Sequence, residues 1–176
     1  MTPHGPVEDF WKSACTTFAV DLSGQAEYML GDPAATEKSM RQALEMHKHW
    51  PTHNEFDQRD EARMATLLAM ALAREGRAAD AQHVITPVVK FHRELAARNH
   101  GDEFQHVEFA SALYAQALAD KHARPALLKE ADALIAGLPA QMRDLRSVRL
   151  WRDRIREELH GRTAALARGA LRGAPG

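Results

Sequence analysis

Cysteine is almost absent from this chain, and long apolar runs are absent altogether. Cys15 is the one cysteine among 176 residues, so neither an intrachain disulfide nor a zinc site with several cysteine ligands is possible. No run of about 18 apolar residues occurs, so we expect no membrane span. The first residues have neither a basic start nor an apolar core, and we expect no signal peptide. These features favour a cytoplasmic protein in a reducing compartment.

An excess of charge of one sign is also missing. The net charge is −1 and the pI about 6.8, so the chain as a whole has no attraction for nucleic acid or an anionic membrane, and we expect neither as a partner. The motifs of phosphate-binding loops, dinucleotide-binding turns, nucleophile elbows and helical zinc proteases do not occur. We therefore expect no cofactor and no catalysis.

Strand patterns are absent, whereas helix formers dominate. Apolar residues at spacings of three and four predict seven helices, at about 7–30, 33–49, 55–75, 78–99, 103–120, 125–136 and 144–160. Gly31 and Gly76 are expected to end helices in the left-handed conformation, and Asp32 and Asp102 to cap the helices that follow. Before the third helix, Thr52 and Glu55 have capping-box spacing, with Asn54 as a competing cap. Within the fourth, Pro87 predicts a kink with one unpaired carbonyl.

The same spacing predicts which side chains face the core. In the first helix the predicted core stripe comprises Val7, Trp11, Ala14, Phe18, Leu22, Ala26 and Met29. In the third helix it begins at Phe56. In the last helix it comprises Leu145, Val148, Trp151, Ile155 and Leu159. Trp11 and Trp151 are therefore interpreted as packing residues.

An internal repeat organises these helices. The residues around Gly76 return in weaker form about 46 positions later, and a fainter copy precedes them by about 45. Each copy is a helical run that stops at a turn and precedes a second helical run. The predicted fold is all-α, with three antiparallel helix hairpins and a C-terminal capping helix that share one core. We expect a single domain over 7–160 and a flexible tail over 161–176.

One copy carries a family resemblance. The pattern Ala65-x2-Leu68-Ala69-x2-Leu72-x3-Gly76-x4-Ala81-x3-Ile85-x2-Val88 resembles a degenerate tetratricopeptide repeat. It departs from that family in three respects: it lacks first-helix aromatic residues, it has Arg93 in place of a closing proline, and its period exceeds the usual 34 or so residues. Segments such as Pro87–His92 and Arg149–Ile155 are also similar to C-terminal helical-repeat regions of larger bacterial signalling and regulatory proteins.

The resemblance implies that the hairpins stack as a TPR-like α-solenoid. It also implies a non-catalytic module that binds a protein or peptide within a regulatory or signalling system. The first helix of each pair would form a concave binding face, with polar positions at Arg59, Arg63, Gln105 and Glu108. Trp50 lies off the apolar pattern, which makes it the aromatic anchor that we expect to contact the partner.

A helical-bundle enzyme or metal-binding protein that uses His and Glu side chains is the alternative. Ten histidines are present, and Glu103-x-x-His106 has the spacing of half of a di-iron motif. The second half is missing, so Glu103 is better explained by the favourable charge in a helix's first turn and His106 as a surface residue. Cys15 is expected to be a semi-buried structural thiol rather than a nucleophile.

The C-terminal part is locally basic. Nine arginines and four acidic residues lie between Gln141 and Gly176. Such a patch suits an acidic peptide, a nucleic acid backbone or an anionic lipid surface. Trp151 is its one aromatic residue, which argues against single-strand binding. The interleaved Asp153 and Glu157 favour a solvated helix face with no partner.

Overall fold

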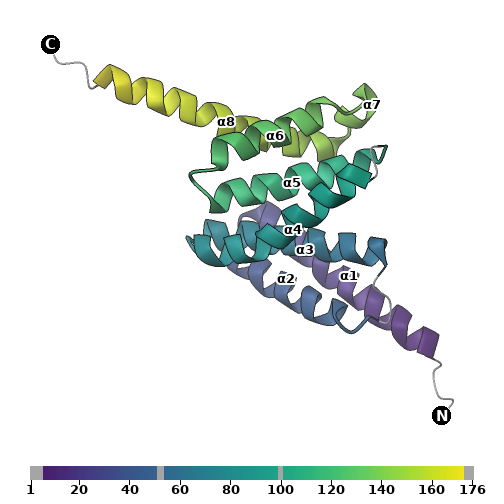
Figure 1. Cartoon of the computed structure of the whole chain (residues 1–176). Coiled ribbons are helices and arrows are strands. Elements are labelled where there is room, and N and C mark those ends of the chain that lie inside the picture. The colour runs from purple at the N-terminus through teal and green to yellow at the C-terminus, as the bar shows by residue number, and fades with distance from the viewer. Residues whose placement is uncertain (1–5, 51–53, 99–100, 173–176) are drawn as a thin grey trace.

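The described part of the chain is a stack of α-helices joined by short turns (Figure 1). The computed structural model describes the backbone of residues 6–50, 54–98 and 101–172. Within these ranges, it describes the side chains of residues 11 to 161. No strand occurs among the described residues, which confirms the predicted all-α class. The helices are α1 (Pro6–Leu30), α2 (Pro33–His47), α3 (Glu55–Arg74), α4 (Ala78–Arg98), α5 (Glu103–Ala119), α6 (Arg124–Ala136), α7 (Ala140–Arg143) and α8 (Arg146–Arg172). Within the described ranges, none of the helices has the length and apolar character that a bilayer crossing requires.

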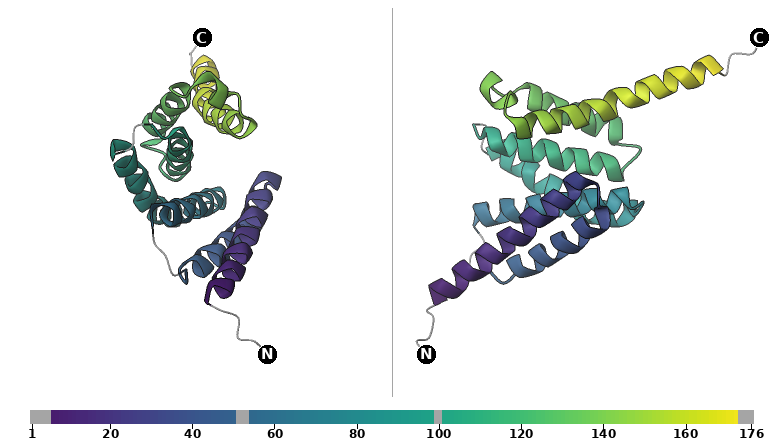
Figure 2. Two further views of the ribbon diagram at one scale, coloured as in Figure 1. Left: turned by 90° about the vertical axis from the view of Figure 1, so that its right-hand side faces the viewer. Right: turned by 180° about the vertical axis from the view of Figure 1, so that it is seen from behind.

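Each helix from α1 to α6 packs against the next along the chain. The pairs α1/α2, α3/α4 and α5/α6 follow one another from the N-terminal to the C-terminal end, and α8 lies against the last pair and projects beyond it (Figure 1). Helix α3 also contacts α5, so first helices of neighbouring pairs touch. The stack follows a curved course, which brings the end of α1 close to α8 (Figure 2).

Two glycines end helices as predicted. Gly31 and Gly76 each have φ of 81°, in the left-handed region. After Gly31 the amide of Asp32 donates to the Glu27 carbonyl over 3.0 Å, and after Gly76 the amide of Arg77 donates to the Leu72 carbonyl over 2.9 Å. These bonds satisfy carbonyls that the helix leaves unpaired, so two sharp turns follow from two glycines.

Side-chain caps begin α2, α3 and α5. The Asp32 and Asp102 carboxylates accept from amides three residues later, which confirms both predicted caps. Before α3, Asn54 accepts from the Asp57 amide, and the Asp57 carboxylate accepts from the Asn54 amide. Of the two capping patterns in the sequence, Thr52 with Glu55 and the competing cap at Asn54, the structure shows the cap at Asn54. Thr52 itself lies outside the described residues.

One continuous core joins the hairpins to α8. Small residues dominate α3 and α5 at their contacts, among them Ala69, Ala71, Ala110, Ala112 and Ala115, which allows close helix approach. Val148 and Ile155 of α8 are buried in the same cluster as the α6 side chains. Burial of a Val or Ile side chain contributes about 1.5–3 kcal/mol. Helix α8 therefore covers the open side of the last hairpin.

The predicted core stripe of α1 is wrong in most positions. Ala14 is buried, but Trp11 is 60% exposed and Leu22 is 63% exposed. The exposed positions also include Phe18, Ala26 and Met29, and Val7 lies outside the described side chains. The buried face carries Ala14, Thr17, Asp21, Gly24 and Tyr28 instead.

Close packing with α2 explains this choice of face. A Cβ at Gly24 would lie 2.3 Å from Met40 Cε and 3.0 Å from Ser39 Cβ, so a larger residue here would push the end of Met40 away from α1. Small side chains thus decide which side of α1 faces α2, and the large apolar side chains point away from it. Cys15 is exposed as well, not semi-buried as predicted.

Three smaller differences concern single elements. Phe56 of α3 and Leu145 before α8 are exposed and do not face the core. The short helix α7 had no counterpart in the apolar pattern. The last helix continues past His160 to Arg172. Its later turns extend away from the hairpins, which explains why they need no apolar stripe (Figure 1).

Candidate functional site

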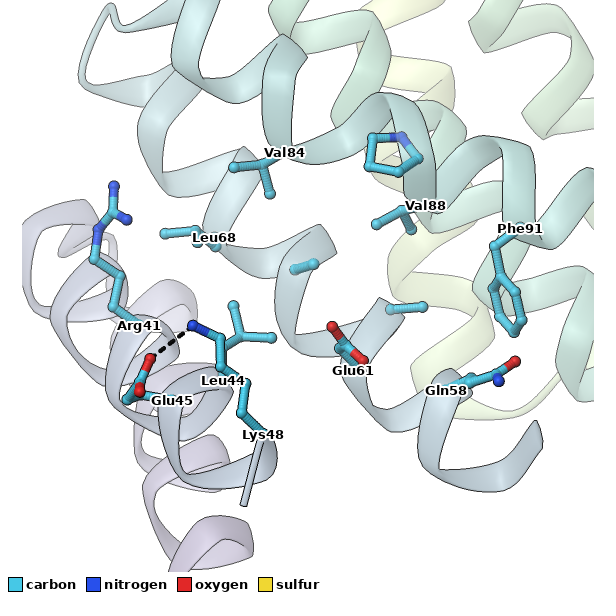
Figure 3. Close-up of a pocket in the computed structure, with 13 residues that line it drawn as sticks. Arg41, Leu44, Glu45, Lys48, Gln58, Glu61, Leu68, Val84, Val88 and Phe91 are labelled. Carbon is cyan, nitrogen blue, oxygen red and sulfur yellow. Dashed lines mark hydrogen bonds and ion pairs between the residues drawn. The ribbon is translucent and has the colours of Figure 1, made fainter. Parts of the chain in front are cut away.

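A groove with an apolar floor lies between α2, α3 and α4 (Figure 3). Its volume is about 600 Å³. The apolar side chains that line it are Leu44 of α2, Ala62, Ala65 and Leu68 of α3, and Val84, Pro87, Val88 and Phe91 of α4. We call this feature the outer groove.

Residue size and backbone chemistry shape the outer groove. The small residues Ala62 and Ala65 keep the α3 floor low, while Leu44 and Phe91 rise from the helices on either side. On the α4 wall, Pro87 has no amide proton and cannot bond the carbonyl of His83. The helical hydrogen bond one turn before Pro87 in α4 is therefore missing.

The charged residues of the outer groove are mostly paired. Arg41 donates to Glu37 over 2.7 Å, and Lys48 lies 2.7 Å from Glu45. Glu61 forms no hydrogen bond or ion pair with any other described residue. In Figure 3 its carboxylate stands between the α2 wall and the α4 wall. The outer groove is thus apolar, with one carboxylate whose charge no neighbour balances.

Arg59 joins α3 to α5. Its guanidinium lies 2.7 Å from the Asp102 carboxylate and 2.8 Å from the Glu108 carboxylate. Burial raises the pKa of Glu108, and the opposing charge of Arg59 only partly offsets this. Two of the predicted binding residues, Arg59 and Glu108, therefore bond each other across neighbouring hairpins.

Arg63 joins α3 to α1. It pairs with the buried Asp21 and lies 2.8 Å from Asp60 on its own helix. Because Arg63 is partly buried, its two aspartates balance a charge that would otherwise be costly to desolvate. Arg59 and Arg63 thus hold the first helices of three successive pairs at fixed positions.

Gln105 and Trp50 are not on an open surface, contrary to the prediction. Gln105 is 0% exposed, and its amide nitrogen donates to the His92 carbonyl over 3.0 Å. Trp50 is 5% exposed, with its ring 4.4 Å from that of His47 and 5.8 Å from that of Phe18. Trp50 lies three residues after the end of α2 at His47. Helical spacing therefore could not reveal that its ring packs back against α1 and α2.

A second cavity lies on roughly the opposite face of α3. Its volume is about 300 Å³, and its lining comes from α1, α3, α5 and α8. Arg63 and Glu108, two of the predicted binding residues, contribute to its lining. We call it the inner pocket. The approach of α1 to α8 forms it, and only the folded chain brings those segments together.

The di-iron half-motif lies at the start of α5. Glu103 occupies the first turn, where its charge is favourable, and His106 is half-buried one turn later. Over the described residues, no group of three or more His, Cys, Asp and Glu side chains is arranged to hold a metal ion. Neither residue contacts the outer groove or the inner pocket.

Comparison with known proteins places the chain in no family. No family model, no curated protein and no solved structure matches it. The functional argument therefore rests on the chain's own residues.

Proposed function

We propose that this protein is a non-catalytic interaction module of TPR-like α-solenoid type that acts in the cytoplasm. In this proposal, the outer groove binds an amphipathic helical segment of another protein. The observation that carries the proposal is an open recess of about 600 Å³ with an apolar floor and a charged rim. Helix-in-groove recognition uses such recesses, because the partner buries one apolar face and leaves its polar face in water.

The polar groups of the outer groove indicate what the partner segment should carry. Glu61 offers a carboxylate that forms no ion pair with any described residue. It is an acceptor, and it adjoins the apolar side chains of the outer groove. A partner helix with apolar residues at i, i+3 or i+4 and i+7 would fill the floor. A lysine or arginine within that face would satisfy Glu61.

Selection from displayed random segments of about 15 residues, or roughly four helical turns, tests the proposal directly. We expect the purified protein to enrich amphipathic segments that contain one basic residue within the apolar face. Ala65→Glu places a charge on the floor and should abolish their binding. Ala79→Glu changes an exposed alanine outside the outer groove and should leave it unchanged. Enriched segments without this pattern, or equal binding to both variants, would reject the proposal.

Elemental analysis addresses the metal alternative. Iron, manganese or zinc at about one equivalent per chain would instead favour a helical-bundle metal protein, for which Glu103 and His106 are the residues to substitute first.

A further inference from the structure

The inner pocket contains an arginine that has no strong acceptor. Arg154 of α8 lines it, and its Nη2 atom lies 3.3 Å from the Sδ atom of Met29. A thioether sulfur is a weak acceptor. The Nη1 atom is buried and has no hydrogen-bond partner, and no described carboxylate pairs with Arg154.

Aromatic rings hold this guanidinium in place. Its central carbon lies 5.0 Å from the ring centroid of Tyr28 and 5.4 Å from that of Trp151. Trp151 in turn packs edge-on against Tyr114 of α5, with centroids 6.0 Å apart. Ring faces attract a cation but do not accept its N–H groups as a carboxylate does. Arg154 is therefore held in a fixed position, while its Nη1 atom has no acceptor and its Nη2 atom has only a weak one.

An open groove adjoins the inner pocket. It has a volume of about 930 Å³ and is lined by Met29, Leu145 and the first turns of α8. Met29, Ser147 and Leu150 line both spaces, so the two are neighbours. We call the second space the basic groove, because Arg146, Arg149 and Arg152 line it.

The charges of the basic groove are incompletely balanced. Arg152 bonds its neighbour Asp153 over 3.2 Å. Arg146 and Arg149 are exposed and form no ion pair with a described residue. The arginines farther along α8 differ in this respect, since Arg156 lies 2.9 Å from Asp132 of α6. Positive charge without a partner is thus concentrated in the basic groove, next to the inner pocket.

We propose that the inner pocket and the basic groove together bind an acidic peptide segment, with one of its carboxylates bonded to Arg154. The carboxylate takes the place of the Met29 sulfur, and further acidic residues lie along Arg146 and Arg149. Apolar side chains of the segment rest on Leu150 and Trp151. This site lies on roughly the opposite face of α3 from the outer groove and does not depend on it.

A peptide fits this site better than a nucleic acid does. Nucleic acid binding uses a long basic track, whereas Asp153 lies within the basic groove and Glu108 lines the inner pocket. The inner pocket is walled largely by apolar side chains, namely Met29, Leu67, Val107, Leu150 and Trp151. A phosphate backbone gains nothing from such walls, while a peptide with alternating acidic and apolar side chains uses both the walls and the arginines.

Fluorescence anisotropy with defined peptides tests the proposal. The probe is a fluorescein-labelled ten-residue peptide of glutamate and leucine, compared with the same peptide containing glutamine in place of glutamate. We expect the glutamate peptide to bind at least about tenfold more tightly, and the difference to shrink as salt increases. Equal binding of the two peptides would overturn the proposal. So would tighter binding of a thymidine oligonucleotide or of phosphatidylserine vesicles.

Variants of the full chain locate the binding. Arg154→Gln should weaken the glutamate peptide by about tenfold or more, because one charge-assisted bond is lost. Met29→Glu changes an exposed side chain and supplies a carboxylate that competes with the peptide for Arg154. It should weaken binding to a similar extent, and it tests the site independently if Arg154→Gln disturbs packing. Arg156→Gln is the control and should alter binding by less than about twofold. Binding that both Arg154→Gln and Met29→Glu leave intact would refute the site.

Discussion

His92 links the stability of this protein to pH, and the linkage can be worked out from its surroundings. The side chain is 1% exposed on α4, and its ring stacks on Phe109 of α5 with centroids 6.2 Å apart. Its Nδ1 atom is buried without a hydrogen-bond partner. Burial, together with the positive charge of Arg59, which acts in the same direction, lowers the pKa of His92 to about 4.

The sign of the effect follows from the two pKa values. An unfolded chain has a histidine pKa of about 6.5. Between about pH 6.5 and 4 the unfolded chain therefore binds a proton that folded His92 does not, so stability falls as pH falls through this window. The difference between 6.5 and about 4 corresponds to about 3 kcal/mol at 1.36 kcal/mol per pH unit. This free energy is present at pH 7 and lost near pH 4.

His92→Gln removes the titrating group while keeping similar size. Urea unfolding, monitored by circular dichroism, gives the free energy of unfolding of each protein at pH 7 and at pH 4. We expect this free energy to fall between pH 7 and pH 4 by about 3 kcal/mol more in the natural protein than in the variant. His83→Gln changes an exposed histidine of the same helix and should retain the full loss. Parallel pH profiles for the natural protein and His92→Gln would show that His92 is not the source.

Three further predictions concern the stack itself. Ala81→Leu should overpack the contact between α3 and α4 and lower the free energy of unfolding by about 1–3 kcal/mol. Ala79→Leu, at an exposed position, should change this free energy little, and calorimetry would compare the melting temperatures of the two variants. Ending the chain after Leu138 should expose the α6 face and give aggregates or dimers on gel filtration, while ending it after His160 should leave a monodisperse fold. Gly76→Ala should cost about 1–2 kcal/mol because its φ is positive, and an unchanged denaturation midpoint would contradict the turn geometry.

Helix boundaries were predictable because their causes are local. A glycine such as Gly76 ends a helix through its own backbone freedom, and a cap such as Asp102 acts on an amide three residues away. Asn54 shows the limit of this reasoning, since two overlapping capping patterns were visible and only the fold selected one. The extent of α8 past His160 was missed because no apolar stripe marks a projecting helix.

The buried face of α1 and the candidate sites were less predictable because tertiary contacts decide them. Large apolar residues suggested one face of α1, but Gly24 allows Met40 to approach the other. Arg59 is predicted as a binding residue, but its bonds to Asp102 and Glu108 join residues more than forty positions apart. Periodicity reports which face of a helix is apolar and carries no information on such pairings.

The ion pairs of Arg59 change how a binding experiment at this residue must be interpreted. Arg59→Met removes both bonds to α5 and leaves the Glu108 carboxylate, whose pKa burial already raises, without its counter-charge. We expect a loss of stability of about 1–3 kcal/mol, between the values for exposed and buried pairs. Adding Glu108→Gln should recover part of that loss, because the unpaired charge disappears.

Partner binding should follow stability in this pair of variants if Arg59 acts by holding α3 against α5. The outer groove and the inner pocket both border α3, so a shift of that helix alters them without any loss of direct contact. Measured at a temperature where every variant is fully folded, Arg59→Met should then weaken binding, and Arg59→Met with Glu108→Gln should restore part of it. If the double variant regains stability while its binding stays lost, Arg59 contacts the partner itself, as the sequence first suggested.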